Sequence, residues 1–107
     1  MSDRSTALKA HVQAIADALS TGVDSEGEEF WAFDYLEDAL DVEYVVNSQR
    51  ECLGGRVLVA FGGPNIWVDT RTMTVEGSWW GNRQEASFKD AIGLEEAIIE
   101  WWESTAQ

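Results

Sequence analysis

The apolar positions at both ends of the chain repeat with the period of an α-helix. The first such segment begins near Ser5 and ends at Gly22, where a glycine is typical of a helix C-terminus. Its apolar face is formed by Leu8, Val12, Ile15, Ala16 and Leu19. In the last segment the apolar face lies opposite a row of glutamates and is formed by Leu94, Ala97, Ile98, Trp101 and Trp102. The pattern therefore predicts an opening helix and an amphipathic closing helix.

A shorter helix is expected between these two ends, at residues 33–41. Ser25 and Glu28 precede it with the spacing of a capping box. Its apolar side consists of Phe33, Leu36 and Leu40. Its other side consists of Asp34, Glu37, Asp38 and Asp41.

After this helix the apolar positions alternate with the two-residue period of β-strands. Val42–Val46 and Val57–Phe61 alternate in this way, and the glycine pair within Leu53–Arg56 indicates a hairpin turn between them. Ile66–Asp69 and Met73–Trp79 give two further strands, and residues 81–89 are expected to form a loop.

These elements predict one α+β domain that spans residues 1–107. Its order is helix, helix, a four-stranded antiparallel meander, and helix. We expect the helices to pack on one face of the sheet and the other face to be polar.

Acidic residues dominate the charge of the chain, which is −13 in total. Residues 10–49 hold ten acids and no Lys or Arg, whereas residues 50–89 are nearly neutral. The negative electrostatic field of these acids repels phosphates and anionic lipids, so we expect neither direct nucleic-acid binding nor membrane binding. The acids that we assign to a candidate partner-binding surface are Asp24, Glu26, Glu28, Glu29, Asp34, Glu37, Asp38, Asp41 and Glu43.

Catalytic and metal-binding chemistry finds little support in the sequence. The single histidine, His11, lies among alanines on the opening helix, and the single cysteine, Cys52, has no second cysteine with which to bind a metal. Residues 24–29 lack the ligand spacing of an EF-hand loop, and residues 62–64 lack the lysine of a phosphate-binding loop. We therefore expect a protein that is not an enzyme, with no cofactor and no metal. The absence of a signal-peptide or membrane-span pattern predicts a cytoplasmic location.

The most unusual part of the sequence is the segment from Phe61 to Gly81. Trp79 and Trp80 are neighbours, and on a strand they point to opposite faces, so that only one can enter the core. The other Trp, beside Arg83, is a candidate contact residue because Trp and Arg are common in interface hot spots. The candidate binding edge consists of Gly62, Gly63, Pro64, Asn65, Trp80 and Arg83. A purely structural role, in which the turn sets strand register, is the alternative.

The pattern GGPNIWVDT, followed by VEGxWW and by an acidic aromatic helix, resembles small uncharacterised proteins encoded by phages and mobile elements of gut bacteria. The resemblance covers roughly Tyr44 to Trp102 and depends chiefly on Gly62–Thr70 and Val75–Trp80. It implies a mobile-element setting, in which small acidic proteins often serve as anti-defence factors such as anti-CRISPR proteins. The ten acids of residues 10–49 lie outside the region of resemblance.

Three functional interpretations follow. In the first, the acidic surface occupies the basic groove of a nucleic-acid-binding protein as a DNA backbone would, and an inhibitor of a CRISPR effector complex is its concrete form. In the second, the edge at residues 62–65 binds a small ligand or a peptide. In the third, the acidity only keeps a salt-adapted protein soluble. The protein is expected to be a monomer or a homodimer, because Trp101 and Trp102 suit either a core or a twofold interface.

The salt dependence of folding separates the third interpretation from the first two. If acidity serves salt adaptation, repulsion between carboxylates should unfold the protein below about 0.5 M salt, where screening is weaker. If acidity serves binding, the protein should stay folded at about 0.15 M salt. Thermal unfolding followed by circular dichroism across this range checks the outcome, and a melting transition that persists at low salt excludes the salt-adaptation interpretation.

Overall fold

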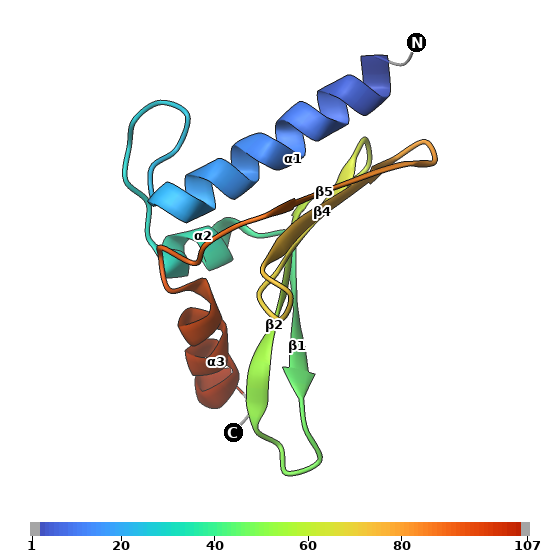
Figure 1. Cartoon of the computed structure of the whole chain (residues 1–107). Coiled ribbons are helices and arrows are strands. Elements are labelled where there is room, and N and C mark those ends of the chain that lie inside the picture. The colour runs from blue at the N-terminus through green and yellow to red at the C-terminus, as the bar shows by residue number, and fades with distance from the viewer. Residues whose placement is uncertain (1–2, 106–107) are drawn as a thin grey trace.

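The computed structural model describes residues 3–105, which form three helices and five strands (Figure 1). In chain order the elements are α1 (Asp3–Thr21), α2 (Ala32–Asp38), β1 (Asp41–Val46), β2 (Cys52–Ala60), β3 (Asn65–Asp69), β4 (Thr74–Trp79), β5 (Asn82–Ser87) and α3 (Leu94–Thr105). The protein has an α+β fold, as the pattern predicts. Within residues 3–105, none of the helices combines the length and apolar character that crossing a membrane requires.

The strands form one antiparallel sheet in the order β1-β2-β3-β4-β5, so each strand pairs with its neighbour in sequence. The predicted meander is confirmed, but its predicted strand count of four is wrong. The fifth strand, β5, forms in the segment that we expected to be a loop. Its sequence, NRQEAS, has one apolar residue, Ala86, and therefore lacks the alternation that marks a strand. Pairing with β4 and contact with α1 make it a strand instead.

The hairpin turn between β1 and β2 also differs from the prediction. Gly54 and Gly55 lie inside β2, and the chain reverses at residues 47–51. Asn47 organises this turn, because its Oδ1 accepts hydrogen bonds from the backbone N–H groups of Gln49 and Glu51, both at 2.9 Å. The Asn47 side chain stabilises the turn through these hydrogen bonds, so Gly54 and Gly55 are not the turn residues.

The second helix is shorter than predicted and is not capped as predicted. α2 ends at Asp38, and Asp41 is the first residue of β1. Its N-cap residue is Trp31, which makes no side-chain capping hydrogen bond, so the Ser25 and Glu28 box does not start the helix. Of its predicted apolar side, Leu36 is buried whereas Phe33 and Leu40 are exposed.

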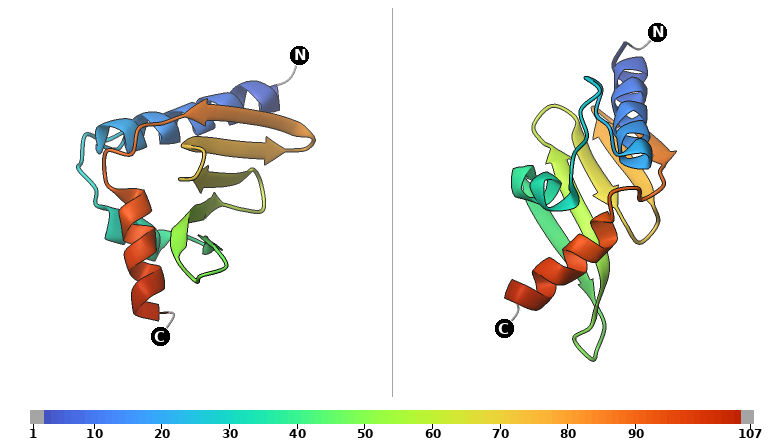
Figure 2. Two further views of the ribbon diagram at one scale, coloured as in Figure 1. Left: turned by 60° about the horizontal axis from the view of Figure 1, so that its bottom comes forward. Right: turned by 90° about the vertical axis from the view of Figure 1, so that its left-hand side faces the viewer.

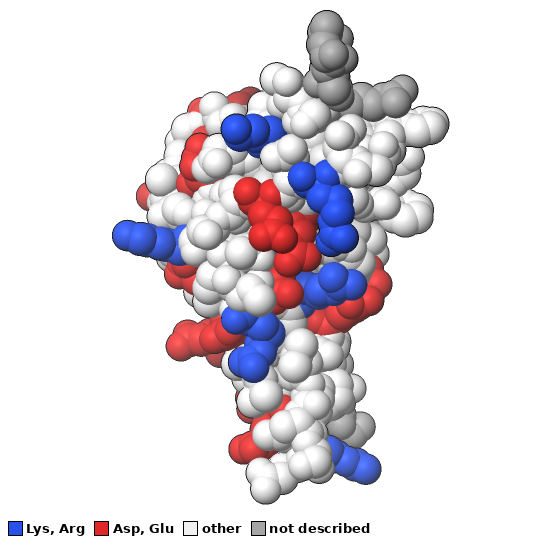
Figure 3. Space-filling model, turned by 45° about the vertical axis from the view of Figure 1, so that its right-hand side comes forward, with Lys and Arg blue, Asp and Glu red and all other residues white. Residues whose placement is uncertain are grey.

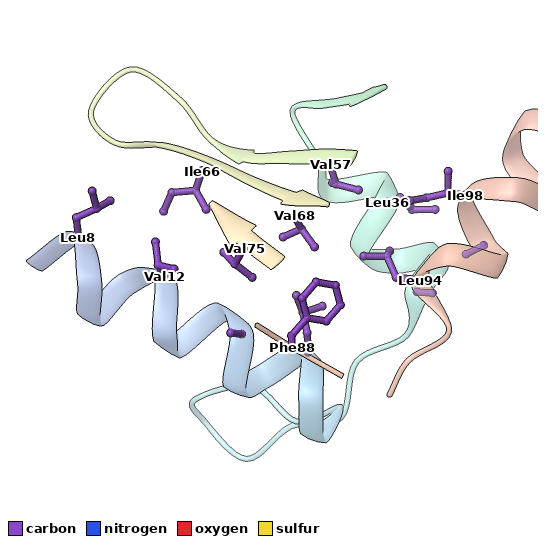
Figure 4. Close-up of a cluster of buried hydrophobic side chains, with 14 residues drawn as sticks. Leu8, Val12, Leu36, Val57, Ile66, Val68, Val75, Phe88, Leu94 and Ile98 are labelled. Atoms are coloured by element: carbon purple, nitrogen blue, oxygen red, sulfur yellow. The ribbon is translucent and has the colours of Figure 1, made fainter. Parts of the chain in front are cut away.

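The helices cover one face of the sheet. In Figures 1 and 2, α1 runs along β4 and β5, and α3 lies beside β2. Val57, Val68 and Val75 form a buried cross-strand row on this face, and Figure 4 shows them among side chains from the helices. The opposite face carries the alternate positions, which are mostly polar or charged. The predicted layer arrangement is therefore confirmed.

Two glycines let the helices approach the sheet closely. A Cβ atom at Gly77 would lie 2.6 Å from Val12 Cγ2 of α1 and 2.9 Å from Leu8 Cδ1. A Cβ atom at Gly55 would collide with the backbone carbonyl oxygen of Glu43 and lie 3.3 Å from Ile98 Cγ2 of α3. Each of these positions therefore requires a residue without a side chain.

We predict that the two glycines differ in their tolerance of alanine. Gly55→Ala should lower the free energy of unfolding by about 3 kcal/mol, because backbone must move, and Gly77→Ala by about 1 kcal/mol, because only side-chain ends must shift. Gly63→Ala is the control, since nothing lies within 4 Å of its Cβ position. Urea unfolding of the three variants measures the order of their free energies of unfolding. Equal losses for Gly55→Ala and Gly63→Ala would contradict the prediction.

Candidate functional site

Seven candidate carboxylates lie on the loop between α1 and α2 and on α2 itself. All seven residues are exposed, and they are Asp24, Glu26, Glu28, Glu29, Asp34, Glu37 and Asp38. Among the residues that the structure describes, none of the seven forms an ion pair with Lys or Arg. We call these seven residues the acidic layer. Its charge is therefore left to face solvent or a partner.

The loop that carries four of the seven residues of the acidic layer is held in a defined shape. Asp24 Oδ1 accepts hydrogen bonds from the backbone N–H groups of Glu26 and Glu28, both at 2.9 Å, and Asp24 N–H donates to the carbonyl of Glu28. A β-bridge between Val23 and Glu29 closes the loop. These bonds fix the backbone from which the glutamates project.

The last two acids of the predicted surface, Asp41 and Glu43, lie on β1 and not on the loop or on α2. They alternate with Val42 on β1 and therefore lie on the sheet face that the helices leave open. Glu43 Oε1 forms an ion pair of 2.7 Å with Arg56 Nε, and the Arg56 guanidinium lies 4.0 Å from the centre of the Trp67 ring. Figure 3, seen from the side of the strands, shows cationic and anionic side chains intermixed. Carboxylates on this face therefore lie among Lys and Arg side chains.

Sequence reasoning missed the contribution of α3 to the acidic side of the molecule. Glu96 and Glu100 of α3 line a hollow together with Trp31 and Phe33, which lie at the start of α2. The side chain of Trp31 is 65% exposed and that of Phe33 is 44% exposed. Residues 90–107 hold five acids and no Lys or Arg, which was the available signal, but only the packing of α3 against α2 joins these acids to the aromatic residues.

A pocket of about 230 Å³ opens between α1, the following loop and α2. Its wall is mainly apolar, and the residues that line it are Ile15, Ala18, Leu19, Asp24, Phe30, Asp34, Tyr35 and Asp38. The rings of Phe30 and Tyr35 pack against each other with their centres 5.6 Å apart. Burial raises the pKa of Tyr35 to about 12. The phenol therefore stays neutral throughout the physiological range.

The structure brings the residues of the alternative binding edge to one end of the sheet. Asn65, Ser78 and Arg83 are register partners across β3, β4 and β5. The turn at residues 62–64 joins β2 to β3 at this end, and Asn65 Oδ1 accepts a hydrogen bond of 3.3 Å from Gly62 N–H. Phe61, just before this turn, is 73% exposed.

Trp80 stands out at the same end because of its backbone. It lies in the turn between β4 and β5 with φ +53°, followed by Gly81 with φ +85°. Two successive positive φ values favour Asn-Gly or Gly-Gly, and a bulky residue is rare there. Trp80 is 74% exposed whereas Trp79 packs against the core, so the expectation that only one of the pair enters the core is confirmed.

The remaining candidates for chemistry lie apart from one another. His11 is exposed on α1, and Cys52 is half-buried with its Sγ donating a hydrogen bond of 3.3 Å to the Gly54 carbonyl. Among residues 3–105, no three His, Cys, Asp or Glu side chains are grouped so that they could hold a metal ion.

Comparison of the chain with protein-family models, with curated proteins and with solved structures finds no match. The resemblance to mobile-element proteins over residues 44–102 therefore stays a prediction. The function has to be inferred from the charge and geometry of the surfaces described above.

We predict that Tyr35 ionises late and that its ionisation destabilises the fold. Because its pKa is raised from 10.0 to about 12, its contribution to stability is complete below about pH 10 and is lost as the pH rises toward 12. The tyrosinate absorbance of the wild type minus that of Tyr35→Phe should develop near pH 12. Urea unfolding of both proteins at about pH 8 and about pH 11 should show that the free energy of unfolding of the wild type, relative to that of Tyr35→Phe, falls between these two pH values. A difference absorbance that develops near pH 10 would contradict this.

Proposed function

We propose that this protein is an acidic inhibitor that occupies the basic groove of a nucleic-acid-binding protein. The acidic layer, extended by the glutamates of α3, takes the place of a nucleic-acid backbone in that groove. An effector complex of a bacterial defence system, such as a CRISPR effector, is the partner class that the expected mobile-element setting favours. The inhibitor then acts in the cytoplasm of the host cell and has no catalytic role.

The observation that carries this proposal is the mixture of exposed aromatic residues with carboxylates. Trp31 and Phe33 are exposed beside Glu96 and Glu100. A surface that serves solubility alone gains nothing from exposed aromatic rings, which promote association. Aromatic rings surrounded by charge are typical of protein interfaces, where Trp in particular contributes much of the binding energy.

The charge distribution supports a cationic partner. The absence of Lys and Arg from residues 10–49 leaves the acidic layer without neutralising neighbours in its own part of the chain. Fixed carboxylates attract a basic groove over a distance of about one Debye length and speed the encounter. The same negative electrostatic field repels free nucleic acid, as expected of a protein that competes with nucleic acid for a basic groove.

Charge reversal within the acidic layer should abolish inhibition. Glu29→Lys combined with Glu37→Lys changes two exposed side chains for which the structure shows no hydrogen bond or ion pair within its described part. The control, Glu51→Lys with Glu85→Lys, changes the net charge equally on the strand side of the molecule, and it also removes the hydrogen bond of 2.9 Å that Glu51 Oε1 accepts from Asn47 Nδ2. DNA binding by a panel of purified defence effectors, with and without the inhibitor, measures the effect. The proposal predicts a loss of at least tenfold for the first pair and about no loss for the control, since close charge pairs across interfaces are worth more than 1.4 kcal/mol.

Inhibition that survives the Glu29 and Glu37 reversal would contradict the proposal. Such a result would favour the second candidate function, a peptide or small-ligand site at the edge that holds Trp80 and Arg83. The strained backbone of Trp80 favours this candidate, because such strain is often retained for function. Trp80→Asn separates the two, since it relieves the turn and removes the ring: it should abolish binding at the edge and leave inhibition by the acidic layer unchanged.

A further inference from the structure

The pocket between α1 and α2 has the size of a site for one side chain. Its volume of about 230 Å³ lies below the range of about 300 to 1,000 Å³ that is typical of sites for cofactors and drug-sized ligands. Ala18 contributes only a methyl group to the wall, so the space above this part of α1 is left open. Phe30 and Tyr35 line the pocket from the other side and offer aromatic surface. The pocket can therefore bury a single large apolar group.

Three carboxylates surround this apolar space. Asp24, Asp34 and Asp38 line the pocket, and each is an exposed residue, so their charge lies where the pocket meets solvent. No Lys or Arg is among the residues that line the pocket. An apolar group that enters the pocket is consequently favoured when positive charges flank it.

Asp34 lies in the first turn of α2, where the helix dipole favours an anion, but its spacing from Asp38 and the position of Asp38 are unfavourable for the helix. Asp34 and Asp38 are four residues apart on α2, where like charges repel. Asp38 also lies in the last helical turn, where the negative end of the helix dipole opposes an anion and no basic residue compensates. A cation held between these side chains would relieve both penalties. Local rules that a sequence breaks in this way are most often broken for function.

We propose that this pocket is the anchor site of the inhibitor, and that it takes one large apolar side chain from a basic segment of the partner protein. The basic character of the partner is taken from the proposed function, on which this inference rests. The inference adds the place on the inhibitor where the partner binds. The occupant is a segment in which Leu or an aromatic residue is flanked by Lys or Arg. The apolar side chain enters between Ala18 and Tyr35, and the flanking cations meet the rim carboxylates.

Two synthetic peptides test the anchor. The first is a blocked peptide with the order Lys-Arg-Leu-Arg-Lys, and the second is identical except that Ser replaces Leu. Titration calorimetry at about 0.15 M salt should show the Leu peptide binding at least tenfold more tightly, because burying one Leu side chain is worth that much or more. Amide NMR shifts should map the Leu peptide to Ala18, Phe30 and Tyr35.

Variants of α1 supply the matched control. Ala18→Met fills the pocket and should reduce the affinity for the Leu peptide to that for the Ser peptide. Ala14→Met, one helical turn earlier on an exposed position outside the pocket, should change neither affinity. Both substitutions keep a residue that favours helices. If Ala18→Met does not fold, Asp34→Asn combined with Asp38→Asn should weaken binding of the Leu peptide at least threefold while leaving the apolar wall intact.

Several outcomes overturn the anchor site, and they differ from those that overturn the inhibitor. Equal binding of both peptides, or NMR shifts that miss the pocket, overturns the anchor site and leaves the acidic layer as a purely electrostatic surface. A dimer that Ala18→Met abolishes would mean that a second copy fills the pocket, and this also overturns the proposal. The inhibitor itself fails if the wild-type protein inhibits no effector, or if reversal of Glu29 and Glu37 leaves effector inhibition unchanged.

Discussion

The close approach of two helices to one face of a single sheet is the constraint on which the rest of the structure depends. α1 meets the sheet at Gly77, and α3 meets it at Gly55. The end of β3 is locked to the second of these sites, because the buried Thr70 hydroxyl donates to the Gly55 carbonyl at 3.0 Å and accepts from Gly55 N–H at 3.1 Å. A side chain at Gly77 would push α1 outward, and a side chain at Gly55 would collide with the backbone of β1 and crowd Ile98 of α3.

Because both long helices are used to cover the sheet, the remaining helical segment serves a different purpose. α2 buries Ala32 and Leu36 but leaves its carboxylates and Phe33 at the surface. Its position between α1 and α3 creates a hollow on each side, one beside Ala18 and one beside Glu100. The short helix thus combines apolar hollows with fixed negative charge, and the proposed binding of a basic protein depends on this combination.

The open face and the free end of the sheet differ from this acidic side in chemistry. On the open face Arg56 is shared between Glu43 and the Trp67 ring, so that charge is neutralised locally. At the end of the sheet Trp80 is exposed from a turn whose backbone disfavours it. The two proposed contact surfaces can therefore be separated by substitutions that do not touch a common residue.

The sequence by itself determined the elements whose apolar period is strong, because burial on one side imposes that period. The face of α1 from Leu8 to Leu19 and the alternation in β4 are of this kind. Tertiary structure alone decided that the polar segment of β5 is a strand, that Gly55 serves packing and not a turn, and that Glu100 lies beside Trp31. Each of these depends on contacts that exist only in the folded chain: β5 pairs with β4 and packs against α1, Gly55 is constrained by the Glu43 backbone of β1 and by Ile98 of α3, and the surface shared by α2 and α3 forms only once they pack.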